Sequence, residues 1–186
     1  MESINEEQEG VMNILVPFIH RLCPIFSSAM TMYNDEYPSL VRAQHESRTR
    51  ANCVYDHAWM GLESEFILDE GFHFLDIRGL KILNIRDELV IRVKKVDANG
   101  YHRNYPTAQQ KAFDKQEELP GLPTEATRIV LGYQPDIAFS EVERVIVRDP
   151  IKKWASQIIE GEAKASWIDI TPIELPFREA KRKKSR

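Results

Sequence analysis

The sequence predicts an α+β protein, with N-terminal helices followed by a mainly antiparallel β-sheet that has a short inserted helix. Before Gly71, apolar residues recur every three to four positions, which is typical of helices. After it, apolar and polar residues alternate, which is typical of strands. Helices first and strands afterwards favour α+β over alternating α/β. We expect a single domain over 11–177, with a helical part at 11–70 and a β-rich part at 71–177.

Charge is distributed unevenly along the 186 residues, of which 42% are hydrophobic and 29% charged. The nine residues 178–186 carry six basic side chains and one acidic one, whereas the rest carries 19 basic and 28 acidic. We expect 1–10 to be a disordered acidic N-terminus and 178–186 a disordered basic tail. The tail could reach nucleic acid through counterion release or could be merely solvated. An acidic body argues against a dedicated nucleic-acid binder.

Cysteine content and the first apolar segment indicate a cytoplasmic protein. Cys23 and Cys53 are too few for a disulfide framework. The apolar run 11–32 contains Pro17 and Pro24, which should kink or segment it. Broken backbone bonds are costly in a bilayer, so we expect no membrane span. The run is better interpreted as a core or partner-facing helix.

The remaining helices and strands follow from periodicity and turn signals. A second, longer helix is expected at 40–68, with Gly71 as its stop. Three strands of an antiparallel meander are expected at 72–77, 80–85 and 88–96. The third should have one buried face and one partly polar face.

Beyond residue 96, the sequence predicts a short helix and several more strands. Thr107 can cap the helix, which should extend to Glu117. The segment 153–159 fits either a strand or a helix. The expected strands, the last of them an edge strand, are 127–133, 141–148 and 167–173.

Cations and turn residues gather between Arg92 and Tyr133. A Gly-containing turn follows two lysines, and an amide, a hydroxyl and a helix start come next. This pattern fits a site for an anion or for nucleic acid. Ordinary turn and cap chemistry explains the same residue types, so both interpretations stay open. The candidate residues are Lys94, Lys95, Arg103, Asn104, Thr107 and Arg128.

Arg50 and His57 form a second candidate site, which would be catalytic. They lie seven positions apart, so a helix places both on one face. The segment 50–57 resembles the motif of HEPN-type ribonucleases, although Ala51 stands where that family usually has a polar residue. The resemblance implies that His57 moves a proton and Arg50 stabilises phosphate charge. The alternative is a solvated helix face.

Metal sites have weaker support, and we expect no metal or cofactor. Cys53 and His57 are one helical turn apart, but His45 lies about 12 Å back along a continuous helix. Asp149 and the run 162–164 match an Asp…Glu-x-Lys nuclease pattern only superficially, because the second part does not look like a core strand.

About half of the chain resembles a family of uncharacterised bacterial proteins. The resemblance rests on 45–57 and on residues in the order 92–97, 104–107, 109, 113–114, 119–123, 126–128 and 132–133. Such proteins are encoded beside Xre-type helix-turn-helix regulators and ImmA/IrrE-like proteins, in operons that resemble toxin–antitoxin pairs. The resemblance implies a setting and carries no activity.

We therefore expect a protein-interaction component of a toxin–antitoxin-like or phage-defence operon, with a protein partner such as the helix-turn-helix regulator. Its helical N-terminal half would be the docking surface, and a homodimer stays open. The first alternative is a ribonuclease-type toxin that uses Arg50 and His57. The second is a regulator that binds nucleic acid through its tail.

Overall fold

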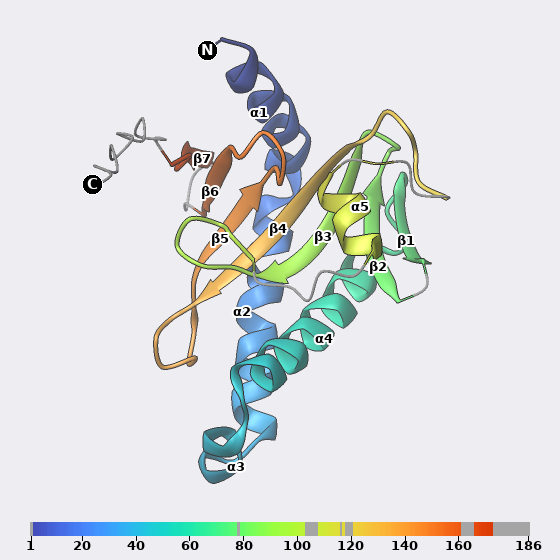
Figure 1. Ribbon diagram of the computed structural model, residues 1–186. Helices are drawn as coiled ribbons and strands as arrows, with labels where there is room; N and C mark the ends of the chain where they lie inside the picture. The colour runs from blue at the N-terminus through green and yellow to red at the C-terminus, as the bar shows by residue number, and fades with distance from the viewer. Residues whose placement is uncertain are drawn as a thin grey trace, which may run out of the picture.

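A computed structural model shows the predicted α+β fold, in which helices precede a seven-stranded sheet (Figure 1). The strands lie in sequence order, β1 to β7. The structure describes residues 2–77, 79–102, 108–115, 117, 121–160 and 166–172.

The first helical segment begins much earlier than expected. α1 starts at Glu2, so the N-terminal residues expected to be disordered are helical. Gln8 anchors α1 to the last two strands, because its Nε2 donates to Ser156 Oγ at 2.9 Å and to Asp169 Oδ1 at 3.1 Å. The helices of this half are α1 (Glu2–Leu15), the 3₁₀ turn η1 (Val16–Phe18), α2 (Ile19–Glu36), α3 (Ser39–Gln44) and α4 (Ser47–Phe66).

The two prolines act differently on the apolar run. Pro17 lies in η1, where the α-helix is interrupted, whereas Pro24 lies inside α2, which continues through it. The stretch Glu6–Glu36 is long and apolar enough to cross a membrane by composition. Its apolar residues at helical spacing, such as Leu15 and Phe26, are fully buried against the sheet. That burial is compatible with the core helix of a soluble protein.

The helix expected over 40–68 is divided in two, and it ends before Gly71. His45 is extended between α3 and α4, and its carbonyl accepts a hydrogen bond from Arg50 Nε at 3.0 Å. The Arg50 side chain therefore supplies a hydrogen bond to a carbonyl that the break in the helix would otherwise leave without one. α4 ends at Phe66, while Gly71, at φ +82°, forms the turn into β1.

The sheet begins with the antiparallel meander that the sequence predicts. Phe72 pairs with Ile85, and Leu83 pairs with Ile91. The segment 153–159, left open by its periodicity, contains strand β6. The strands are β1 (Phe72–Ile77), β2 (Leu80–Ile85), β3 (Leu89–Lys95), β4 (Thr127–Pro135), β5 (Val142–Arg148), β6 (Ala155–Ile159) and β7 (Ser166–Asp169).

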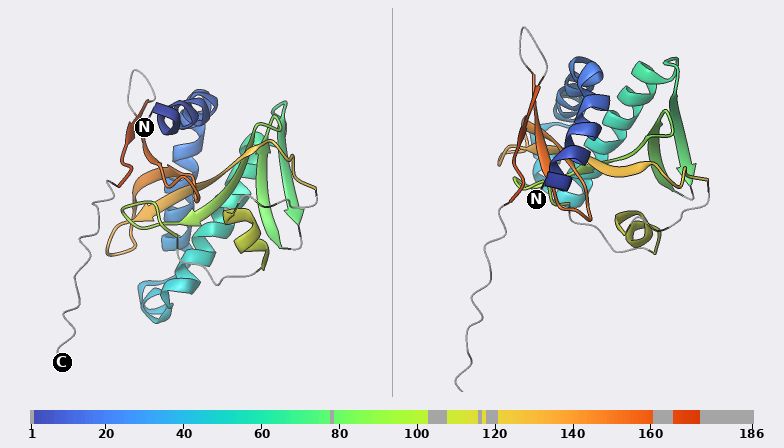
Figure 2. Two further views of the ribbon diagram at one scale, coloured as in Figure 1. Left: turned by 45° about the horizontal axis from the view of Figure 1, so that its top comes forward. Right: turned by 90° about the horizontal axis from the view of Figure 1, so that it is seen from above.

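β3 and β4 form the one parallel pair in this sheet. The sequence predicted a mainly antiparallel sheet and did not indicate which pair would be parallel. The register runs from Leu89 opposite Thr127 to Lys95 opposite Tyr133. A parallel pair requires a crossover. Here the crossover includes α5 (Ala108–Asp114), which lies on the opposite side of the sheet from α2 and α4 (Figure 2).

The sheet is therefore covered on both faces, which corrects the expectation of a partly polar face on β3. Ile91 and Ile129 point to α1, α2 and α4 in the main core. On the other side, which we name the far face, Phe113 of α5 packs in a smaller cluster that contains Ile82 and Val90. Arg92, expected on a polar face, is only 6% exposed.

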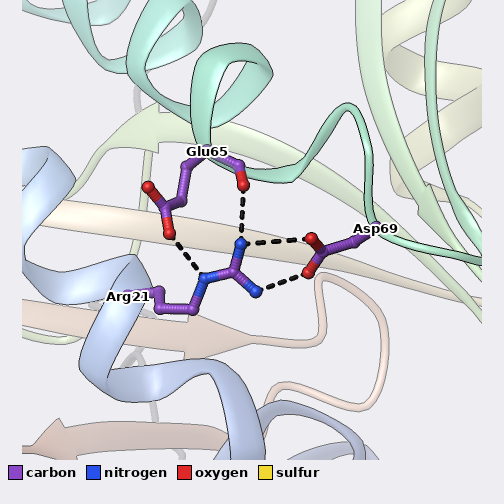
Figure 3. A network of polar contacts seen from close by, with 3 residues as sticks. All are labelled: Arg21, Glu65 and Asp69. Atoms are coloured by element: carbon purple, nitrogen blue, oxygen red, sulfur yellow. Dashed lines mark hydrogen bonds and ion pairs between the residues drawn. The ribbon is translucent and has the colours of Figure 1, made fainter.

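Arg21 joins α2 to the end of α4 (Figure 3). Its guanidinium contacts the side chain and the carbonyl of Glu65 and the carboxylate of Asp69. It also lies 4.3 Å from the ring centroid of Phe66. A carbonyl left open at a helix end thereby gains a charged donor.

Candidate functional site

Three buried arginines lie on the far face of the sheet. Alternation along β3, β4 and β5 places Arg92, Arg128 and Arg148 there, and each is at most 6% exposed. Arg92 and Arg148 both flank Val130, which pairs with each of them across the sheet. Buried guanidinium groups are rare unless they are paired, so their contacts define what this face can do.

Arg148 is held by the loop 97–102 that follows β3. Its Nη1 donates to Asn99 O at 2.8 Å, and its Cζ lies 3.7 Å from the ring centroid of Tyr101. Its Nη2 is buried and has no hydrogen-bond partner among the residues that the structure describes. One face of this guanidinium is thus fixed by the loop, while one donor remains available.

The sequence of the loop explains its close approach to Arg148. Asp97 Oδ1 accepts hydrogen bonds from the backbone N–H groups of Asn99 and Tyr101, each at 2.9 Å. Gly100 has φ +77°, and a Cβ there would lie 3.0 Å from Ile146 and 3.3 Å from Arg148. Only glycine combines this backbone conformation with the available space.

A pocket of about 190 Å³ opens beside Arg148. Two of its walls come from His102 and Asp114, whose Nε2 and Oδ2 atoms lie 3.7 Å apart. This pair links the loop to the end of α5. The lining residues are Tyr101, His102, Asp114, Val130, Arg148 and Pro150.

The structure separates the two lysines predicted to share an anion site. Lys94 lies on the far face, near Arg92 and Asp114, and burial lowers its pKa to about 8. Arg92 lowers this pKa further, whereas Asp114 opposes the shift. Lys95 points to the helices, where its Nζ lies 3.2 Å from Ser47 Oγ. Strand alternation therefore leaves only one of the two lysines, Lys94, on the face of the sheet that carries the pocket.

Arg128, the remaining described residue of that predicted set, also lies on the far face. Its Nη1 donates to the carbonyl of Glu117, just after α5, and burial lowers its pKa. Arg128 thus helps to hold the crossover segment against the sheet. Arg103, Asn104 and Thr107 lie outside the described residues.

Arg50 and His57, the predicted catalytic pair, each contact a different neighbour. Arg50 bonds the His45 carbonyl, as described above, and His57 Nε2 lies 3.1 Å from Glu36 Oε2. No hydrogen bond or ion pair joins Arg50 to His57 in the described part of the chain. These contacts fix α4 to α3 and to the end of α2.

The candidate metal ligands have other contacts. His45 Nδ1 lies 3.1 Å from Tyr33 Oη, and Cys53 Sγ lies 3.9 Å from Tyr37 Oη. Asp149 Oδ1 accepts two backbone hydrogen bonds within its own turn. The described residues contain no group of three His, Cys, Asp or Glu side chains placed to hold a metal ion. The run 162–164 lies outside them.

A second surface lies at the end of the molecule that carries α3. Leu40 and Val41 of α3 are 79% and 40% exposed, and Ile137 of the β4–β5 hairpin is fully exposed. Asn34 of α2 joins the two elements, because it accepts from Arg42 of α3 and donates to the hairpin. We name Leu40, Val41 and Ile137 the apolar tip.

The hairpin that presents Ile137 is fixed by its own side chains. Asp136 accepts from the backbone N–H groups of Ser140 and Glu141 and from the Ser140 hydroxyl. Phe139 points inward and packs edge-on against Tyr33, with ring centroids 5.8 Å apart. Phe139 is therefore buried, whereas Ile137, two residues earlier in the same turn, points outward.

Of the far-face arginines, only Arg128 was among the predicted site residues, although the sequence contains a signal for all three. Arg92, Arg128 and Arg148 alternate with aliphatic residues inside predicted strands. When a sheet is covered on both faces, arginines that alternate with aliphatic residues along a strand are buried instead of facing solvent. Comparison with family models, with curated proteins and with solved structures found no match to this chain.

Proposed function

We propose that this chain acts by binding a protein partner through the apolar tip. The observation that carries the proposal is the exposure of three aliphatic side chains on two elements at one end of the fold, with Ile137 fully exposed. Single exposed apolar residues are ordinary, whereas several gathered on one surface mark a site of interaction.

The rigidity of the tip supports this function. Asp136 fixes the hairpin turn, and Asn34 ties the hairpin to α2 and α3. Side chains that are already ordered lose less conformational entropy when they bind. Leu40 and Ile137 can therefore act as preorganised anchors.

The proposed docking surface is narrower than the helical N-terminal half expected from the sequence. The run 11–32 was interpreted as a core or partner-facing helix, and most of its apolar residues fill the core of this chain. Exposed apolar side chains remain on α3 and on the hairpin, and others, such as Met60 and Leu68, lie outside the tip. The family resemblance supports a helix-turn-helix regulator as the partner, in a toxin–antitoxin-like or phage-defence setting.

The test is co-expression of the full chain with the regulator encoded beside it, followed by size-exclusion chromatography with light scattering. We expect a complex with the wild type and none with the double variant Leu40→Ser/Ile137→Ser. The matched control is Met60→Ser/Leu68→Ser, because these side chains are 62% and 95% exposed and lie outside the tip. The control should form the complex.

Two results would overturn the proposal. One is a chain that stays monomeric alone and forms no complex with the regulator. The other is a complex that the tip variant forms as well as the wild type does. A homodimer that the tip variant abolishes would instead identify a second copy of the chain as the partner.

A further inference from the structure

The pocket on the far face is built around a donor that has no acceptor. Arg148 is 3% exposed, and its Nη2 has no hydrogen-bond partner in the described part of the chain. A buried charged donor without a partner is costly, and native proteins rarely leave one. Arg148 also lines a pocket of about 190 Å³, which provides space for an acceptor beside this donor.

The donor is preorganised rather than mobile. Tyr101 stacks on the guanidinium, and Asn99 O accepts from Nη1. Gly100 allows the loop to lie directly against the Arg148 stem. A ligand would therefore meet an arginine whose orientation is already fixed, which lowers the entropy lost on binding.

The charges around the pocket favour an anion. A guanidinium donates and never accepts, so Arg148 cannot ligate a cation. The carboxylate in the pocket wall, Asp114, lies 3.7 Å from His102 Nε2 and interacts electrostatically with Arg92 and Lys94. Three basic side chains thus surround this one carboxylate, which limits its repulsion of a bound anion.

The size of the pocket restricts the anion to a small one. Pockets for drug-sized ligands are about 300–1,000 Å³, larger than this pocket. Val130 and Pro150 supply apolar wall beside the donor, which suits a short carbon chain or a compact tetrahedral group. Guanidinium groups form their strongest hydrogen bonds with carboxylate and phosphate oxygens.

We propose that this pocket binds a small oxyanion, a phosphate or a short carboxylate, with Arg148 Nη2 as the donor. The site lies on the far face and is separate from the apolar tip. Loss of oxyanion binding should therefore leave formation of the protein complex unchanged, so the two proposals fail independently.

The test is an NMR titration of the full chain with sodium phosphate and, separately, with sodium acetate. Sodium chloride at equal ionic strength is the control. We expect saturable shifts of the backbone amides at 99–102 and 148–149 with at least one oxyanion and none with chloride. Shifts with phosphate alone assign a phosphoryl ligand, shifts with acetate alone assign a carboxylate, and shifts with both assign their shared chemistry.

Variants connect the binding to the proposed donor. Arg148→Lys should weaken it at least about tenfold, because a lysine ammonium lacks the planar fork that places Nη2 while Nη1 donates to Asn99. Arg144→Lys, on the same strand and face, should leave it unchanged. If Arg148→Lys does not fold, Val130→Ile replaces it, since the added methylene reduces the pocket and should also weaken binding.

The proposal is overturned if neither oxyanion shifts these amides saturably in the wild type. It is equally overturned if they shift but the affinity is the same in Arg148→Lys, or in Val130→Ile where the lysine variant does not fold.

Discussion

Arg21 on α2 donates to both carboxylate oxygens of Asp69, with Nη1 at 2.5 Å from Oδ2 and Nη2 at 3.2 Å from Oδ1 (Figure 3). The same guanidinium donates to Glu65, from Nε to Oε1 at 2.5 Å and from Nη2 to the carbonyl at 2.6 Å. A single side chain therefore fixes α2 to the end of α4. Asp69 lies just before the turn into the sheet, so this contact also orients β1.

Replacing Arg21 by alanine should lower the free energy of unfolding by about 1–2 kcal/mol. Hydrogen bonds to charged groups contribute more than neutral ones, but partial exposure reduces the value through solvent screening. Urea denaturation measures the change. Glu70→Ala is the matched control, because Glu70 is exposed and has no hydrogen bond or ion pair in the described part of the chain. An equal effect of both variants would contradict the assigned role of Arg21.

Acid should weaken the fold through Asp69. The hydrogen bond from Arg21 lowers the pKa of Asp69 below its ordinary value near 3.8, although burial opposes the shift. A carboxyl group whose pKa is lower in the folded state contributes stability above the unfolded pKa, and this is lost as the pH falls through the folded pKa. We expect the difference in stability between wild type and Asp69→Asn to shrink below about pH 4. Urea midpoints at pH 7 and pH 3 test this, and an unchanged difference would refute it.

Lys94 should give a second pH dependence, in the alkaline range. Burial lowers the pKa of Lys94 to about 8 from 10.5, so above pH 8 the unfolded state binds more protons. The free energy of unfolding contributed by this group should rise from pH 8 to about pH 10.5 and be level below pH 8. Lys94→Met should remove the rise. Lys111→Met, at an exposed position on α5, should retain it. Urea midpoints across this range measure both variants.

Gln8 should contribute strongly to the docking of α1. Its side-chain amide is 1% exposed and donates to Ser156, Asp169 and the carbonyl of Ala155. Gln8→Ala removes a donor from the buried Ser156 hydroxyl, whereas Ala155 O and Asp169 Oδ1 keep bonds to residues 170 and 171. We expect a loss of about 1–3 kcal/mol and faster amide exchange in α1. Glu9→Ala, at the exposed neighbouring position, should change neither quantity. If α1 exchanges at the wild-type rate in Gln8→Ala, the amide does not hold the helix.

His57→Ala distinguishes the structural contact of this histidine from catalysis. His57 pairs with Glu36, which is half exposed, so we expect a change in stability below about 1 kcal/mol. Expression of the wild type and of the variant in bacteria should affect growth equally. Circular dichroism checks that both are folded. Growth inhibition by the wild type that the folded variant lacks would instead support the ribonuclease alternative.

Local periodicity was sufficient to predict most elements of the fold. Apolar spacing identified α2 and α4, and alternation gave the bounds of β1 and β2 as the structure has them. The acidic composition of 1–10 misled, because a helix can be polar along most of its surface and still dock through one side chain such as Gln8. Likewise, the helical pattern continued through His45, where a tertiary donor, Arg50, compensates the break.

The residues that line the candidate pocket were not predicted from the sequence. Of the predicted cations, Lys94 and Arg128 lie on the same face of the sheet as the pocket, whereas Lys95 was grouped with them only because it is adjacent in sequence. Neighbours on a strand point to opposite faces, so sequence proximity cannot group side chains once the chain forms a sheet. Arg148 belongs to a strand two positions away in the sheet from β3.

The sequence by itself determined most of the helices and strands, because hydrophobic period and turn residues act locally. Only the tertiary structure decided that β3 and β4 run parallel, that the crossover covers the far face, and that Arg148 meets Tyr101, His102 and Asp114 there. Those outcomes depend on contacts between distant segments, whose register is selected by burial on both faces of the sheet. The apolar tip has the same origin, because α3 and the β4–β5 hairpin are connected through Asn34 of α2 only once the helices pack on the sheet.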